Sequence, residues 1–145
     1  MDTKMKKILL LTIFLLSFCA TSFAASWQWI YSTNNTTFSI DTASIIKKEN
    51  MYTAWLKVVP LEYAQQEING KKVAFILQRH SYKNTDMGVQ AKLLQTVFYD
   101  KTKDVIYTDF NQANWEPLIP VSIGELAYKK IVESYNSKHL QSTKN

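Results

Sequence analysis

Six extended runs follow one another along this chain, and a helical pattern begins only after the last of them. Each run is rich in β-branched and aromatic residues and is bounded by residues that favour turns. This pattern is typical of β-strands joined by short connections. The expected strands are 27–31, 36–40, 51–59, 72–82, 89–99 and 104–110. Strands first and one helix last predict an antiparallel sheet rather than alternating βαβ units.

The pair Asn69-Gly70 is the strongest turn signal between these runs. Both residues tolerate the positive φ that a type I′ hairpin turn requires. The segment 61–68 before this pair fits two interpretations, because its apolar residues match either a strand or a helical turn. The stretch 111–120, after the last strand, is expected to be an irregular connection.

The helix at the end of the chain carries several agreeing signals. Ser122 is a favoured N-cap, and Glu125 three residues later completes a capping box. Val121 before the cap and Leu126 after it predict a hydrophobic staple. Apolar residues then recur at helical spacing, at Ile123, Leu126, Ala127, Ile131 and Tyr135. The polar residues 136–145 are expected to form a disordered tail.

The predicted fold class is therefore α+β, with an antiparallel sheet of about six strands and a C-terminal helix packed on one face. The other face of such a sheet meets water or a partner. Residues 25–145 are long enough for one domain with its own core. A homodimer through a sheet edge is a further expectation.

The first 24 residues have the three parts of a secretory signal peptide. A basic start at Lys4, Lys6 and Lys7 precedes an apolar run of residues 8–18, and small residues stand before a cleavage site at Ala24. The run is too short to span a bilayer, which needs about 20 apolar residues. The sequence thus predicts export to the cell surface, the periplasm or the outer envelope.

Cys19 is the only cysteine and offers an alternative, which is lipid attachment. Phe18 occupies the position before it, where that signal normally has a small residue, so cleavage after Ala24 is preferred. Cleavage would leave a mature chain without cysteine. Disulfides, thiol catalysis and cysteine-bound metal would then be excluded together.

The charge balance does not favour a nucleic-acid partner. Without Lys4, Lys6, Lys7 and Asp2, the chain's 17 basic and 12 acidic residues become 14 and 11, a net charge of +3. The basic residues are scattered along the sequence, whereas nucleic-acid binders concentrate them on one face. A moderately charged, solvated surface is the expected arrangement.

Chemical motifs are weak. His80 and His139 lie 59 positions apart, without the spacing of a zinc site, and His80 is expected to be a partly exposed strand residue. Asp100, Asp104 and Asp109 could form an acid–base pair or a weak calcium site, but turn and surface roles are favoured. With three glycines there is no phosphate-binding loop. No catalytic residue, metal or cofactor is predicted.

The segment around Pro117 and Pro120 has the P-x-x-P spacing of a polyproline ligand. Leu118 and Ile119 between the prolines favour burial instead. We therefore expect this segment to close the domain at the helix entrance, with Trp115 as an anchor.

Three stretches together resemble the surface-adhesin protein E family of small exported bacterial proteins. They are WQWIYSTNNTTFSIDTASI at the mature start, YTAWLKV with VFYDKTKDVI in the middle, and WEPLIPVSIGELAYKKIV at the end. The resemblance covers nearly the whole mature chain. It implies an antiparallel sheet of about six strands with a C-terminal helix. It also implies exposure in the envelope and, as for some members, adhesion to host matrix proteins.

The expected function is an exported, non-enzymatic adhesin-type binder of an extracellular or envelope protein. The alternative is a periplasmic accessory or inhibitor protein with an envelope partner. A small-molecule cofactor is not expected. Four basic residues on predicted strands are the candidate contacts: Lys71, Lys72, Arg79 and Lys92.

Overall fold

The computed structural model describes residues 24–142. The expected signal peptide therefore lies outside the described residues except for Ala24, and so do Cys19 and residues 143–145. No helix within residues 24–142 is long and apolar enough to cross a membrane.

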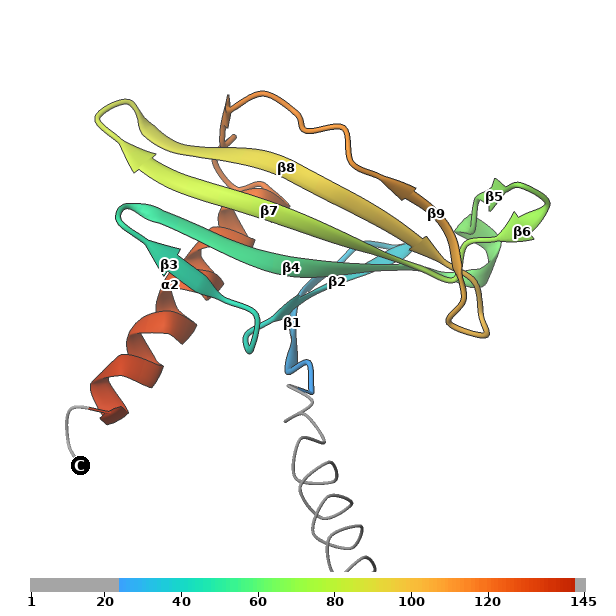
Figure 1. Cartoon of the computed structure of the whole chain (residues 1–145), viewed down its shortest axis with the longest axis horizontal. Coiled ribbons are helices and arrows are strands. Elements are labelled where there is room, and N and C mark those ends of the chain that lie inside the picture. Colours follow the sequence, from blue (N-terminus) through green and yellow to red (C-terminus); the bar gives the residue numbers. More distant parts are fainter. Residues whose placement is uncertain (1–23, 143–145) are drawn as a thin grey trace, which may run out of the picture.

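The described chain folds into one antiparallel sheet, a small hairpin and a long helix (Figure 1). The sheet contains β1 (Trp27–Ser32), β2 (Thr36–Asp41), β3 (Ile46–Lys48), β4 (Met51–Pro60), β7 (Phe75–Thr85), β8 (Gly88–Tyr99), β9 (Val105–Asp109) and β10 (Glu116–Pro117). The hairpin is β5 (Glu67–Ile68) with β6 (Lys71–Lys72), preceded by the 3-10 turn η1 (Glu62–Ala64). The helix is α2 (Ile123–Ser142). The predicted α+β class is confirmed.

The eight strands occupy only six positions across the sheet, because two positions are shared. β2 pairs with residues 56–60 of β4, and β3 pairs with residues 51–53 along the same side. In the same way, β9 and β10 pair with opposite halves of β8. The two strands beyond the expected six are thus short pieces, β3 and β10, that lengthen existing positions.

The Asn69-Gly70 turn is confirmed, with φ of 51° and 73° for the two residues. The ambiguous segment before it contains both predicted structures, first η1 and then β5. The strand expected from residue 72 begins later, at Phe75. Val73 lies outside the main sheet. Its N–H donates to the carbonyl of Gln66, and its side chain is buried.

The core lies between α2 and the half of the sheet that carries the β7–β8 turn. Its buried members are Ile40, Tyr52, Ala54, Leu56, Tyr82, Ala127 and Ile131. Tyr52 meets two helix tyrosines edge to face, with ring centroids 6.2 Å from Tyr128 and 5.6 Å from Tyr135. Figure 1 shows α2 along one side of the sheet and no second layer of the described chain on the other. The predicted one-sided packing is confirmed.

The helix start is partly as predicted. Ser122 Oγ accepts the N–H of Glu125 at 3.2 Å, so Ser122 is the N-cap. Glu125 Oε2 accepts the N–H of Val121 at 2.6 Å, one residue before its usual target. The hydrophobic staple is wrong, because the Val121 side chain is 88% exposed. Leu118 packs at this helix start instead, beside Gly124.

The predicted disordered tail is also wrong for residues 136–142, because α2 continues to Ser142. One side chain of this last part holds it to the preceding fold, because Lys138 Nζ donates to the carbonyl oxygen of Thr42. Within the helix, the His139 ring lies 4.1 Å from that of Tyr135. A polar composition indicated disorder, whereas the contact with Thr42, 96 residues earlier in the chain, holds the extended helix in place.

Changing Ser122 to Ala is expected to lower the free energy of unfolding by about 1 kcal/mol, because the N–H of Glu125 loses its partner. Chemical denaturation followed by circular dichroism measures this change. Ser122→Asp, which can also accept at an N-cap, should restore most of the loss. An unchanged unfolding curve for Ser122→Ala would place the helix start elsewhere.

Val121→Gly is expected to raise the free energy of unfolding by about 1 kcal/mol. Val121 has a φ of +61°, which is costly for a β-branched residue and free for glycine. Its side chain is exposed, so its removal costs no burial. A thermal unfolding scan should show a higher midpoint than that of the unchanged protein. A lower midpoint would contradict the strain at this residue.

Candidate functional site

The sheet has one face free of the helix, which we call the open face. Side chains of a strand alternate between the two faces. Tyr52, Ala54 and Leu56 of β4 are buried in the core on the helix side, so Trp55 and Lys57 point to the open face. Strand register extends this assignment across the sheet, because residues directly opposite one another share a face.

All four tryptophans of the chain lie on the open face. Trp55 reaches it from β4. Trp29 does so from β1, because Trp29 pairs with Ser39 and Ser39 pairs with Lys57. Trp27, two residues earlier on the same strand, shares that orientation, and its ring lies 5.7 Å from Lys57 Nζ. Trp29 is 62% exposed, which is unusual for so large an apolar side chain.

Trp115 joins the open face from the segment before β10. Glu116 pairs with Ala91, a residue packed against the core, so the preceding Trp115 points to the opposite face. Its ring lies 4.3 Å from Nζ of Lys83, which pairs with Met51. Trp115 therefore lies against the open face and not at the helix entrance, where the sequence analysis expected it as an anchor.

The basic side chains on the strands of the open face are Lys48, Lys57, Arg79, Lys83 and Lys92. Within residues 24–142, none of them belongs to an ion pair. The one carboxylate at a strand position of this face is Asp41, which is 7% exposed. Its Oδ1 accepts the N–H of Ser26 at 2.7 Å and that of Ala43 at 3.0 Å. The accessible charge of the open face is thus positive.

Aromatic and basic residues are interleaved on this face. Lys57 Nζ lies 4.7 Å from the Phe75 ring, in addition to its contact with Trp27. Trp55 and Arg79 are directly opposite each other on β4 and β7. Contacts of a cation with an aromatic ring contribute about 0.5–1 kcal/mol at exposed sites. Tryptophan, tyrosine and arginine are the residues enriched at protein interfaces. The open face therefore has the composition of a binding surface for a negatively charged partner.

The open face is hollowed where β3 meets β4. The hollow has a volume of about 430 Å³ and is lined by Ala43, Ser44, Ile46, Thr53, Ala54, Trp55 and Arg79. Most of this lining is apolar, and Ile46 is 57% exposed. Ser44 Oγ accepts the N–H of Trp55 at 3.1 Å and holds the 42–45 turn against β4. A partner side chain of moderate size fits such a hollow.

The structure brings together two of the four predicted contact residues. Arg79 and Lys92 both lie on the open face, since Lys92 pairs with Ser81 and Arg79 lies two residues from Ser81. Lys71 and Lys72 lie apart from them on β6, outside the main sheet. Lys71 Nζ is 3.5 Å from Oδ2 of Asp100, so its charge is already paired.

The sequence analysis predicted that basic residues are scattered, and the strand register shows instead that several of them share one face. Basic residues far apart in the sequence occupy alternate positions on three adjacent strands, β4, β7 and β8, and therefore share one side. Acidic side chains lie mainly elsewhere: in turns, on the hairpin and on α2.

His80 is a partly exposed residue of β7, as predicted. It lines a hollow of about 260 Å³ on the helix side, together with Leu93, Glu116 and Leu118. Burial lowers the pKa of the imidazole to about 4. The ring is therefore neutral at physiological pH. Its Nε2 lies 3.4 Å from Oε1 of Gln78, and His139 lies on α2 in contact with Tyr135.

Acidification is expected to destabilise the fold through His80. The unfolded histidine binds its proton near pH 6.5 and the folded one only near pH 4. Stability is therefore full above pH 6.5 and falls as the pH drops towards 4, by at most about 1.4 kcal/mol per pH unit. Urea unfolding between pH 7 and 4 should show this slope, and His80→Gln should flatten it. An equal slope in the variant would contradict the assignment.

The three aspartates make short-range contacts in turns, and Asp100 and Asp104 share the Thr102 hydroxyl, which lies 2.9 Å from Oδ2 of Asp104. Asp100 Oδ1 accepts the N–H groups of Thr102 and Asp104, both at 2.9 Å. The Thr102 hydroxyl, 2.6 Å away, holds the pKa of Asp100 below its usual range. Asp109 accepts the N–H of Asn111 at 2.8 Å. Asp100 is thus a turn residue, as favoured. Within residues 24–142, no group of three or more His, Cys, Asp and Glu residues could hold a metal ion.

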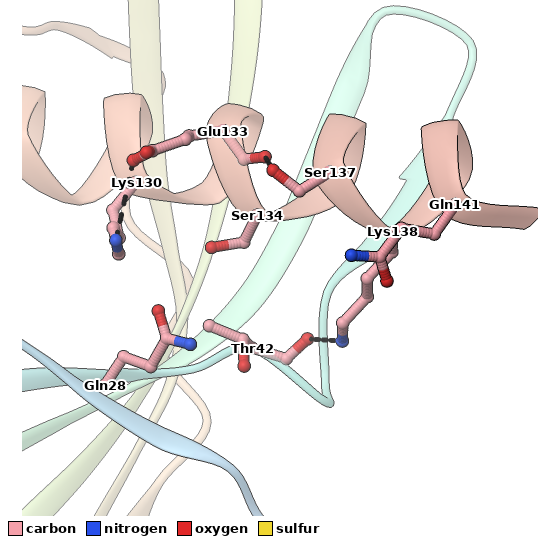
Figure 2. A pocket seen from close by; sticks show the side chains of 8 residues that line it. All are labelled: Gln28, Thr42, Lys130, Glu133, Ser134, Ser137, Lys138 and Gln141. Carbon is pink, nitrogen blue, oxygen red and sulfur yellow. Dashed lines mark hydrogen bonds and ion pairs between the residues drawn. The ribbon is translucent and has the colours of Figure 1, made fainter.

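A third hollow, of about 270 Å³, lies between α2 and the ends of β1 and β2, and Figure 2 shows its polar lining. Lys130 Nζ is 3.5 Å from Oε2 of Glu133. Ser137 Oγ donates to the carbonyl of Glu133 at 2.9 Å, and Lys138 donates to the carbonyl of Thr42. Lys130 and Glu133 thus pair with each other on α2, and Lys138 links the helix to the end of β2. The charged groups of this hollow have partners within the fold, whereas the basic residues of the open face have no ion pair within residues 24–142.

Comparison with known proteins gives no relative from which a role could be transferred. Neither a protein-family model, nor a curated protein, nor a solved structure matches this chain.

Proposed function

We propose that this protein is an exported, non-enzymatic binding protein of the bacterial envelope, of the adhesin type, whose partner is an extracellular protein of a host matrix. The open face is the proposed contact surface. The observation that carries this proposal is the gathering, on one sheet face, of four tryptophans and five basic residues that have no ion pair within residues 24–142. The resemblance to the surface-adhesin protein E family supports the same role.

Physical considerations favour binding over catalysis. Unpaired cations repel one another, so five of them on one sheet face cost stability unless a partner compensates. Exposed tryptophan is similarly costly in water and is common in interfaces. Of the titratable residues that sequence analysis singled out, Asp100 and Asp104 share the Thr102 hydroxyl within one turn, whereas His80 lines a separate hollow on the helix side.

A periplasmic accessory or inhibitor protein is the second candidate, and the same face would bind an acidic envelope partner. Localisation distinguishes the two. Labelling of intact cells with a membrane-impermeant reagent should modify the protein if it is an adhesin. Complete protection in intact cells, with all of the protein in the periplasmic fraction, would replace the adhesin role by the accessory one.

Binding to a panel of immobilised matrix proteins tests the function itself. We expect saturable binding to at least one acidic matrix protein. Raising the salt concentration from 0.1 to 1 M shortens the Debye length from about 10 Å to about 3 Å, so binding should weaken strongly. Surface plasmon resonance measures both effects. No binding to any panel member at low salt would contradict the adhesin proposal.

A further inference from the structure

The strongest local feature of the open face is the hollow beside Trp55 and Arg79. The two side chains are cross-strand neighbours, so their Cβ atoms are about 4.5–5.5 Å apart. Arg79 has no ion pair among the described residues, although it is only partly exposed. An arginine that is partly desolvated and unpaired is primed to receive a carboxylate, because its planar guanidinium binds one through two N–H groups.

The floor of the hollow is suited to an apolar side chain. The side chains of Ala43, Ile46 and Trp55 provide hydrocarbon on most of its walls, and its volume of about 430 Å³ exceeds that of one large aliphatic side chain. Burying such a group there would cover the exposed part of Ile46. Aliphatic insertion beside an arginine and a tryptophan is the arrangement of an interface hot spot.

The hollow also borders a free strand edge. β3 pairs with β4 along one side and with no other strand among residues 24–142. An extended peptide can add to such an edge through backbone hydrogen bonds, and its alternate side chains then point to one face of the sheet. Lys48 and Ile46 of β3 both point to the open face, since they pair with Met51 and Thr53.

The geometry points to an extended acidic segment of the protein partner as the occupant of this hollow. One aliphatic side chain of the segment inserts beside Trp55, and the carboxylates two positions before and after it, on the same side of the extended segment, pair with Arg79 and Lys48. Charge complementarity selects this occupant, because the strands of the open face carry no exposed carboxylate. The inference rests on the proposed function and specifies the chemistry of its partner. A sulfated polysaccharide matches the charge but leaves the apolar lining unused.

The four indole N–H signals in a ¹⁵N–¹H correlation spectrum provide the test, because all four tryptophans report on the open face. The probe is the blocked hexapeptide Glu-Ser-Leu-Ser-Glu-Ser, in which both Glu side chains and the Leu side chain point to one side of an extended chain, titrated into the purified protein. We expect the Trp55 signal to move in a saturable manner. The Trp29 signal should move little, because its Nε1 donates to Ser32 Oγ at 3.0 Å on the far strand β1. Each signal is assigned with a single Trp→Phe variant.

Variants and control ligands determine which part of the hollow is used. Arg79→Gln removes the charge and the guanidinium but keeps an unbranched polar side chain, and it should weaken peptide binding by at least about tenfold. Ala43→Phe, at an exposed position of the rim, should fill the hollow and abolish the Trp55 shift. Lys72→Gln, on the separate hairpin, should leave the affinity unchanged. The control hexapeptide Glu-Ser-Ser-Ser-Glu-Ser should bind at least about tenfold more weakly than the Leu-containing one, and a heparin hexasaccharide should not displace the Leu-containing peptide.

Specific results would overturn the inference. Equal binding of the peptides with and without Leu would show that no aliphatic side chain enters the hollow. Tight heparin binding without peptide binding would replace the peptide by a polysaccharide. Unchanged affinity in both Arg79→Gln and Ala43→Phe would move the contact elsewhere. The proposed function is tested separately from this inference. If the protein binds a matrix protein but not the peptide, only the inference is rejected. If it binds the peptide but no matrix protein, only the adhesin role is rejected.

Discussion

The double variant Arg79→Glu/Lys92→Glu is expected to lose about a hundredfold in affinity for the matrix partner. Both side chains lie on the open face, and reversal places two carboxylates opposite an acidic partner, where like charges cost several kcal/mol. Most of the loss should appear as a slower association rate, because the positive face steers the partner during approach. Surface plasmon resonance at 0.1 M salt measures the rates and the affinity.

The fold should tolerate this reversal. Arg79 and Lys92 have no ion pairs to lose within the described chain, and their neighbours Lys57 and Lys83 are also basic. The matched control is Lys72→Glu/Lys101→Glu, which changes the net charge equally at two exposed positions outside the open face. An equal loss of affinity in the control would show that net charge, rather than the open face, governs binding.

Tyr82→Ala is expected to lower the free energy of unfolding by about 4 kcal/mol. Tyr82 is 1% exposed and is the largest fully buried side chain of the described protein. Its ring lies 5.9 Å from that of Tyr128, so truncation leaves a cavity between the sheet and α2. Burial also raises the pKa of its phenol, which stays neutral throughout the useful pH range. Urea denaturation monitored by circular dichroism gives the change.

Two controls separate the cavity from other effects. Tyr82→Phe keeps the ring and should cost about 1 kcal/mol or less. Tyr63→Ala removes a tyrosine that is 75% exposed, together with one hydrogen bond to the carbonyl of Asn34, and should also cost about 1 kcal/mol or less. A loss below 1 kcal/mol for Tyr82→Ala would contradict the placement of α2 over β7.

Much of the fold could be predicted because its signals are local. Strand alternation, the Asn69-Gly70 turn and the N-cap at Ser122 each involve residues within a few positions of one another. The misses depend on distant contacts. The last turns of α2 are held partly through Lys138 and Thr42, which are 96 residues apart. The two extra strands exist only because β4 and β8 are long enough to pair with two partners along one edge.

The candidate site was harder to predict, because it depends on how separate strands are paired. Trp27 and Trp29, Trp55 and Lys57, and Arg79 and Lys83 are each two or four positions apart, so each pair shares a face within its own strand. That signal is visible in the sequence. The register that places all three pairs on the same face, opposite the helix, is a property of the assembled sheet. The hollow at β3 likewise needs the fold of the 42–45 turn.

The central claim is that the open face is the surface that binds the partner, and hydroxyl-radical footprinting of the complex tests it most directly. Oxidation of Trp29, Trp55 and Trp115, read by mass spectrometry, should fall when the matrix protein is bound. Oxidation of Tyr63 and Met87, which are exposed at opposite ends of the sheet, should not change. Unchanged tryptophan oxidation, with protection of residues on α2 instead, would contradict the claim.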